Sequence, residues 1–153
     1  MELQEQGLKI TGDVNIKVFS EDGSLKEERQ IKNLVVTAGK TYIANRMQAT
    51  SVQTVMNTMA IGTNTATPAV ANTTLGVEAG RVALASFSAS SNQVTATATF
   101  GAGVGTGAIT EAGIFNPTTA GTSGGNMLCR TTFPVVNKAA GDSIAVTWVI
   151  TVS

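Results

Sequence analysis

The carboxyl-terminal stretch Ser143-Ile-Ala-Val-Thr-Trp-Val-Ile-Thr-Val152 is the part of the sequence that decides the fold class. Large apolar residues occupy every second position in it, namely Ile144, Val146, Trp148, Ile150 and Val152. Successive side chains of an extended strand point to opposite faces, so this period of two predicts a strand with one face in a core. We predict a strand over 143–152 with Trp148 buried.

Short strands are also predicted upstream of this stretch, at 81–89, 93–100, 107–115 and 126–133, with a shorter one at 59–61. Clusters rich in Ser, Asn and Gly separate most of them at regular intervals, and a loop is expected over 65–76. Short strands between turn clusters are typical of a β-sandwich. The predicted fold class is therefore mainly β, an antiparallel β-sandwich.

The amino-terminal third contains the clearest hairpin signal. A half-buried strand begins at Val14, and Asp22-Gly23 forms a turn because glycine accepts a positive φ without steric cost. Leu25 to Val36 is predicted as the return strand.

One short α-helix is expected near residues 38–48, with Thr37 as its N-cap and Tyr42, Ile43 and Met47 on one side. Residues 1–12 have no clear period and are predicted to be a flexible, extended N-terminal arm. Residues 13–153 then form a single β-sandwich domain, as expected for a chain of 153 residues.

The composition argues against several classes of function. Ten basic and ten acidic residues give a formal net charge of zero, so we expect no nucleic-acid partner. The single cysteine, Cys129, excludes a disulfide within the chain, and the absence of histidine removes the commonest general base and metal ligand. We see no signal peptide and no transmembrane helix, and therefore expect no membrane partner.

The charges are concentrated at one end of the chain. Residues 1–46 contain 14 of the 20 charged side chains, and residues 47–153 present mainly hydroxyls, amides and small apolar groups. A surface of this kind is weakly protected by charge, and is suited to being covered by a neighbouring subunit. We therefore favour a multi-subunit setting over a monomer.

Three glycine-containing patterns resemble catalytic or nucleotide-binding motifs only in part. Gly39-Lys40-Thr41 lacks the first glycine of a P-loop, because position 34 is leucine, and is better explained as a strand-to-helix turn. Gly103, Gly105 and Ala108 match a loose dinucleotide pattern without the helix and acid that should follow, so we predict a hairpin loop. Residues 121–125 match G-x-S-x-G, but no histidine could activate the serine.

The carboxylates outside the charged third are Glu78, Glu111 and Asp142, which could in principle form a glycosidase pair. Arg81 lies three residues after Glu78, which predicts a solvated ion pair. We expect Glu111, at the centre of a strand, to pair with Arg130 or with the backbone. Catalytic, cofactor-binding and metal-binding residues are therefore all predicted to be none, and no cofactor is expected.

The remaining chemically notable residues are interpreted as core. We predict Cys129 to be a small buried residue on a strand. Most of the few aromatic side chains, including Phe100, Phe115 and Phe133, fall in strand-like runs, which leaves little exposed ring surface for sugar stacking.

Several stretches taken in order resemble small virion structural proteins of tailed bacteriophages. They are residues 32–39 with the following helix, 59–63 with Pro68 and Leu75 downstream, 111–115, 128–131 and 146–149. Related modules are capsid decoration (cement) proteins and tail-fibre or tail-tip proteins.

This resemblance implies a β-sandwich with no enzyme activity that works through its surfaces. We expect a capsid decoration protein that binds the outer shell and stabilises it, with the major capsid protein as partner and a trimer or other small homo-oligomer as its own state. Its expected location is the virion, assembled in the host cytoplasm. The alternative is a tail-fibre or tail-tip attachment module that binds a host surface or another tail protein.

Overall fold

Strand β10 (Ser143–Val152) forms with alternating burial, as its pattern predicts, and it lies at the centre of a five-stranded antiparallel sheet. It pairs with β1 (Ile10–Phe19) on one side and with β7 (Gln93–Phe100) on the other. Strands β2 (Leu25–Lys32) and β6 (Ser86–Ser90) complete this sheet at its two edges, in the order β2-β1-β10-β7-β6. We call it sheet A.

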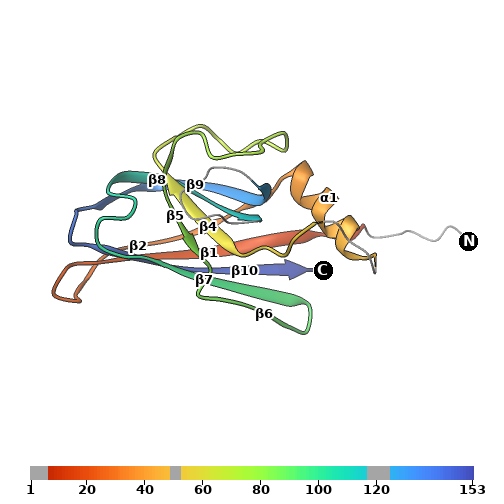
Figure 1. The fold of residues 1–153 in the computed structure, drawn as a ribbon, viewed down its shortest axis with the longest axis horizontal. Helices are drawn as coiled ribbons and strands as arrows, with labels where there is room; N and C mark the ends of the chain where they lie inside the picture. The colour runs from red at the N-terminus through yellow and green to blue at the C-terminus, as the bar shows by residue number, and fades with distance from the viewer. Residues whose placement is uncertain (1–6, 49–52, 117–124) are drawn as a thin grey trace, which may run out of the picture.

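A second five-stranded antiparallel sheet, sheet B, faces sheet A (Figure 1). Its order is β3 (Leu34–Val35), β9 (Asn126–Lys138), β8 (Gly107–Asn116), β4 (Thr58–Gly62) and β5 (Glu78–Ala83). This computed structural model describes residues 7–48, 53–116 and 125–153. The predicted fold class, an antiparallel β-sandwich with one short helix, is confirmed.

The main core lies between the two sheets. Sheet A contributes alternate side chains of its three central strands, and Trp148, Phe100 and Ile144 are fully buried there. Sheet B contributes Met59 and Ile114, among others. Burial of apolar area at about 25 cal/mol per Å² makes this interior the main stabilising contribution.

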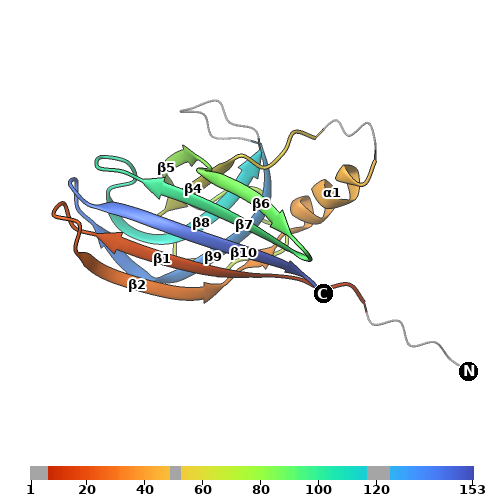
Figure 2. The same cartoon turned by 90° about the horizontal axis from the view of Figure 1, so that it is seen from below.

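Helix α1 (Thr37–Arg46) packs at one end of the sandwich, beside β9 (Figures 1 and 2). It agrees with the helix predicted near 38–48, but Thr37 is not its cap: the N-cap is Val36, and among the described residues no side chain makes an N-cap hydrogen bond. Among the described residues, no helix combines the length and the apolar character needed to cross a bilayer.

The chain enters sheet A earlier than the sequence suggested. Lys9 exchanges backbone hydrogen bonds with Ser153, and β1 begins at Ile10, so the end of the predicted arm over 1–12 belongs to the sheet. Residues 1–6 of that arm lie outside the described residues.

The strand predicted over 81–89 is wrong, because this stretch forms two strands in different sheets. The amide of Leu84 donates to the Asn57 carbonyl in the segment leading to β4, at 2.8 Å, while that of Ala85 donates to Thr97 of β7, also at 2.8 Å. The chain therefore crosses from β5 in sheet B to β6 in sheet A between these two residues.

A similar crossing divides the predicted return strand over 25–36 at Asn33, between β2 in sheet A and β3 in sheet B. The predicted strand over 126–133 also continues further, through Pro134 to Lys138. Proline is tolerated there because it falls at the register shift opposite Ile109 to Glu111, where regular pairing is interrupted.

Candidate interaction surface

The segment between β4 and β5, residues 63–77, contains no charged residue and crosses the outer face of sheet B. It is the yellow-green connection above β8 and β9 in Figure 1. We call it the braced loop, because buried side chains of sheet B hold it from beneath. It agrees with the loop predicted over 65–76.

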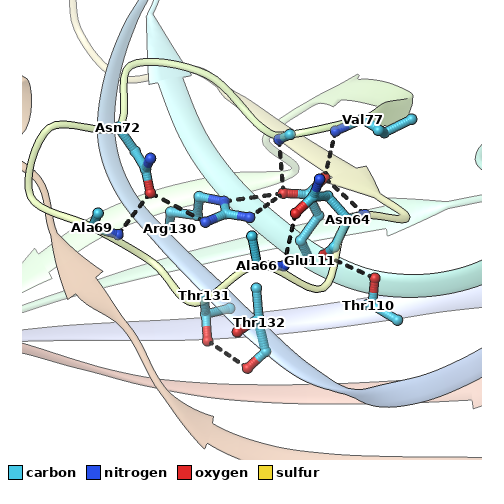
Figure 3. Close-up of polar contacts among 11 residues, drawn as sticks. Asn64, Ala66, Ala69, Asn72, Val77, Thr110, Glu111, Arg130, Thr131 and Thr132 are labelled. Carbon is cyan, nitrogen blue, oxygen red and sulfur yellow. Dashed lines mark hydrogen bonds and ion pairs between the residues drawn. The ribbon is translucent and has the colours of Figure 1, made fainter.

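Glu111 holds both ends of the braced loop. This fully buried residue lies in β8 and its side chain points to the outer face of sheet B (Figure 3). Oε1 accepts hydrogen bonds from the backbone amides of Asn64 at 3.2 Å and Val77 at 2.9 Å. Oε2 accepts one from the amide of Gly76 at 3.0 Å. One carboxylate thus ties the start of the loop to its end.

Arg130 on β9 neutralises this carboxylate and reaches the middle of the loop. Its Nε and Nη2 donate to Glu111 Oε2 at 3.0 and 2.8 Å, and its Nη1 donates to Asn72 Oδ1 at 3.1 Å (Figure 3). The guanidinium is as deeply buried as the carboxylate. A buried ion pair is favourable only when additional hydrogen bonds satisfy its remaining atoms, and the loop supplies them here.

The loop is also fixed through its own turns and through the helix. Asn72 Oδ1 accepts a second hydrogen bond, from the amide of Ala69 at 2.8 Å. The carbonyl of Val70 accepts one from the amide of Thr37, the first residue of α1, at 2.8 Å. The bond from the Ala69 amide to the Asn72 side chain stabilises a turn within the loop, and the backbone bond between Thr37 and Val70 joins the loop to the helix.

A second apolar cluster lies under the braced loop, separate from the main core. It contains Val36, Ala60, Leu75, Phe115 and Met127. The Arg81 guanidinium stacks 4.4 Å from the centroid of the Phe115 ring, which adds a cation–π contact. On the solvent side, Val70 and Val77 remain 51% and 53% exposed. The loop therefore presents a neutral, partly apolar surface on a fixed support.

The expected pairing of Glu111 with Arg130 or with the backbone is confirmed, since it makes both contacts. Sequence reasoning did not anticipate that the backbone partners of Glu111 lie in the long loop. The signal that could have predicted this arrangement was one acid and one base on predicted strands, together with an uncharged loop of this length.

The other two carboxylates considered for catalysis are also engaged by basic groups. Asp142 accepts from Lys26 Nζ at 2.6 Å and from the amide of Ala139 at 2.9 Å, and these hydrogen bonds, that from Lys26 foremost, hold its pKa below the ordinary 3.8. Glu78 forms the predicted ion pair with Arg81, at 2.7 Å. That pair is less solvated than expected, because the Arg81 side chain is only 7% exposed.

Gly39 and Gly105 have packing roles. Gly39 lies in the first turn of α1, as predicted, and a Cβ there would overlap the Leu128 carbonyl oxygen.

Gly105 has φ of 65° in the connection from β7 to β8. The hairpin predicted there is wrong, because these two strands lie in different sheets. Residues 121–124 of the G-x-S-x-G string lie outside the described residues.

Cys129 is fully buried on β9, as predicted, and burial raises the pKa of its thiol well above the usual value. Lys138 is also buried; its Nζ donates to the Gly101 carbonyl at 2.8 Å, and desolvation lowers its pKa. Within the described ranges, no three His, Cys, Asp or Glu side chains gather as a metal site would require.

No protein-family model, no curated protein and no solved structure matches the chain.

Proposed function

We propose that this protein is a non-enzymatic structural component of a bacteriophage virion, a decoration protein that binds the outer shell and stabilises it. Its partner is the major capsid protein, and its copies associate with one another as a small homo-oligomer. The resemblance of the sequence to such proteins suggests the class. The braced loop is the single observation that carries the proposal further, because it supplies a surface for the contact.

The loop has the properties that a docking surface needs. Preorganised surfaces bind more tightly because less conformational entropy is lost when the complex forms. Glu111 and Arg130 fix both ends and the middle of the loop before any partner arrives. The absence of charge over residues 63–77 means that no ionic group must be desolvated when a neutral partner surface covers it.

Binding of this kind stabilises a shell by mass action. A protein that binds the assembled shell but not its dissociated subunits adds RT ln(1 + [L]/Kd), about 2.7 kcal/mol per site when its free concentration is 100 times Kd. Association of several copies adds avidity without requiring any single contact to be strong. A modest, neutral loop contact is therefore sufficient for the proposed role.

The test is to mix the purified protein with capsids that lack it and to image them by cryo-electron microscopy. We expect density at regular positions on the outer shell, with residues 63–77 facing the capsid. Val70→Asp should weaken binding by at least about tenfold, because it places a charge in the contact. Leu25→Asp is the matched control, since Leu25 is 53% exposed on the β1–β2 hairpin, away from the loop.

A bare shell would contradict the proposal. Density confined to the tail would instead favour the tail-fibre or tail-tip alternative, and a cell-adsorption assay would then follow. Equal loss of binding in Val70→Asp and Leu25→Asp would show that the braced loop is not the contact.

A further inference from the structure

The edges of the two sheets are protected very unequally. An unpaired edge strand presents free backbone N–H and C=O groups to other chains, and proteins usually cover or charge such edges. Strands β2 and β6 are the edges of sheet A, and β3 and β5 are those of sheet B.

Charged side chains protect β2. Arg29 on this strand donates from Nη2 to the carbonyl of Val135 on β9 at 2.9 Å, and Glu27 Oε2 accepts from the amide of Asn137 at 2.8 Å. Lys26 forms the ion pair with Asp142. These contacts tie the edge of sheet A to sheet B.

The two edges of sheet B are also limited. Strand β3 has only two residues and leads directly into α1. At β5, Gly80 lies so close to the loop after β7 that a Cβ on it would approach the amide nitrogen of Gly105 to 2.8 Å. Strand β5 also carries the charged residues Glu78 and Arg81, and charged side chains discourage strand addition at an edge.

Strand β6, Ser86-Phe87-Ser88-Ala89-Ser90, has none of these protections. It contains no charge and no proline, and all five of its residues are exposed. In Figure 2 it forms the outer strand of sheet A, beside β7. Within the part of the chain that the structure describes, β6 pairs with β7 alone.

The geometry of the β6–β7 hairpin shows which backbone groups face outward. Ser90 and Gln93 flank the turn Ser91–Asn92 and form its closing pair. In an antiparallel ladder, hydrogen-bonded and non-hydrogen-bonded pairs alternate. The N–H and C=O groups of Ser90, Ser88 and Ser86 therefore point toward β7, and those of Phe87 and Ala89 point toward the open edge.

We infer that β6 is a self-association strand, which pairs antiparallel with β6 of a second copy about a two-fold axis through Ser88. In this register Phe87 lies opposite Ala89 of the other copy, and their outward backbone groups form hydrogen-bonded pairs on both sides of the axis. A large side chain thus faces a small one in each pair. The serines face one another on the other side of the sheet.

The occupant is a second copy because the strand is self-complementary. Its sequence reads almost identically in both directions around Ser88, with serine at both ends and an apolar residue on either side. It carries no charge that a copy of itself would repel. A two-fold contact uses the same patch on both copies and therefore closes, which prevents further strand addition. This inference concerns the isolated protein and stands independently of shell binding.

Sedimentation of the purified chain over a concentration series tests the inference. We expect a dimer, at twice the 15.6 kDa chain mass. Ser88→Lys and Ser88→Glu place like charges opposite each other on the axis, and each should raise the dimer Kd by at least about tenfold. Mixing the two variants in equal amounts should restore dimers, because the charges are then opposite. Thr147→Lys, exposed at the centre of sheet A, is the matched control and should remain dimeric.

Ala89→Pro provides a second, independent variant. It removes an outward N–H and blocks the open edge, but leaves the hydrogen bonds between β6 and β7 in place. We expect a folded monomer by circular dichroism and sedimentation. A monomeric or trimeric wild-type protein, or a dimer that neither the Ser88 variants nor Ala89→Pro weakens, would overturn the inference.

Discussion

Replacing Glu111 by glutamine tests whether the buried ion pair holds the braced loop. The substitution removes the negative charge next to the guanidinium of Arg130, a residue that is only 2% exposed. Breaking a buried pair by removing one partner costs about 3–5 kcal/mol, because the remaining charge is uncompensated. The amide also replaces one acceptor oxygen with a donor, so the amides of Asn64, Gly76 and Val77 cannot all keep their partners.

We expect Glu111→Gln to lower the free energy of unfolding by about 3–5 kcal/mol in urea denaturation. For a chain of this size, that corresponds to a fall in Tm of roughly 6–20 °C. Hydrogen exchange at the amides of Gly76 and Val77 should accelerate more than exchange in the main core, because the loop loses its anchor first.

Glu28→Gln is the matched control, since Glu28 is exposed on β2 and, among the described residues, its side chain accepts a hydrogen bond from half-buried Asn15. It should change stability by no more than about 0.5 kcal/mol. If Glu111→Gln costs less than about 1 kcal/mol, or if exchange at Gly76 and Val77 is unchanged, the carboxylate does not fix the loop and the reasoning fails.

Three further predictions concern the core, the helix contact and pH. Trp148→Ala should cost about 3–5 kcal/mol in urea denaturation, because the side chain is fully buried; a loss below about 1 kcal/mol would contradict this. Gly39→Ala should lower Tm despite the better helix propensity of alanine, since its Cβ would overlap the Leu128 carbonyl oxygen; an unchanged or higher Tm would show that α1 can move away. The depressed pKa of Asp142 stabilises the folded state above pH 3.8, and this contribution is lost as pH falls through the folded-state pKa. Asp142→Asn should therefore flatten the acid limb of a stability–pH curve, and an unchanged limb would mean that its bond with Lys26 contributes nothing.

Local pattern was sufficient to predict much of the fold. The alternation through Trp148 identified a strand because only one face of β10 is buried. The Asp22-Gly23 turn was predictable because Gly23 adopts φ of 87°, which other residues avoid. The pairing of Glu111 was predictable because an acid at a strand centre must find a partner.

Two of the errors, the strands predicted over 81–89 and 25–36, occur where one continuous stretch serves both sheets. At Leu84 and Ala85, consecutive amides bond to the segment leading to β4 in sheet B and to β7 in sheet A, and neither glycine nor proline marks the change. The crossing at Asn33 has a polar residue but no turn motif. Such corners are determined by which distant strands are available as partners, and the local sequence does not contain that information.

The charged residues are unevenly distributed over the folded molecule as well as along the sequence. Residues 1–46 supply β2, whose charges close one edge of sheet A against β9, and the charge-poor remainder of the chain supplies the uncharged braced loop and β6. The loop lies on the outer face of sheet B and β6 at the opposite edge of sheet A from β2, so the two proposed contacts use separate surfaces. A dimer formed through β6 would leave both loops free to dock. Once one loop has docked, the second would dock at an effective concentration set by the rigid spacing between the two loops. Glu111→Gln and Ser88→Lys should therefore act independently: the first loosens the loop without separating the copies, and the second separates the copies while each loop remains anchored.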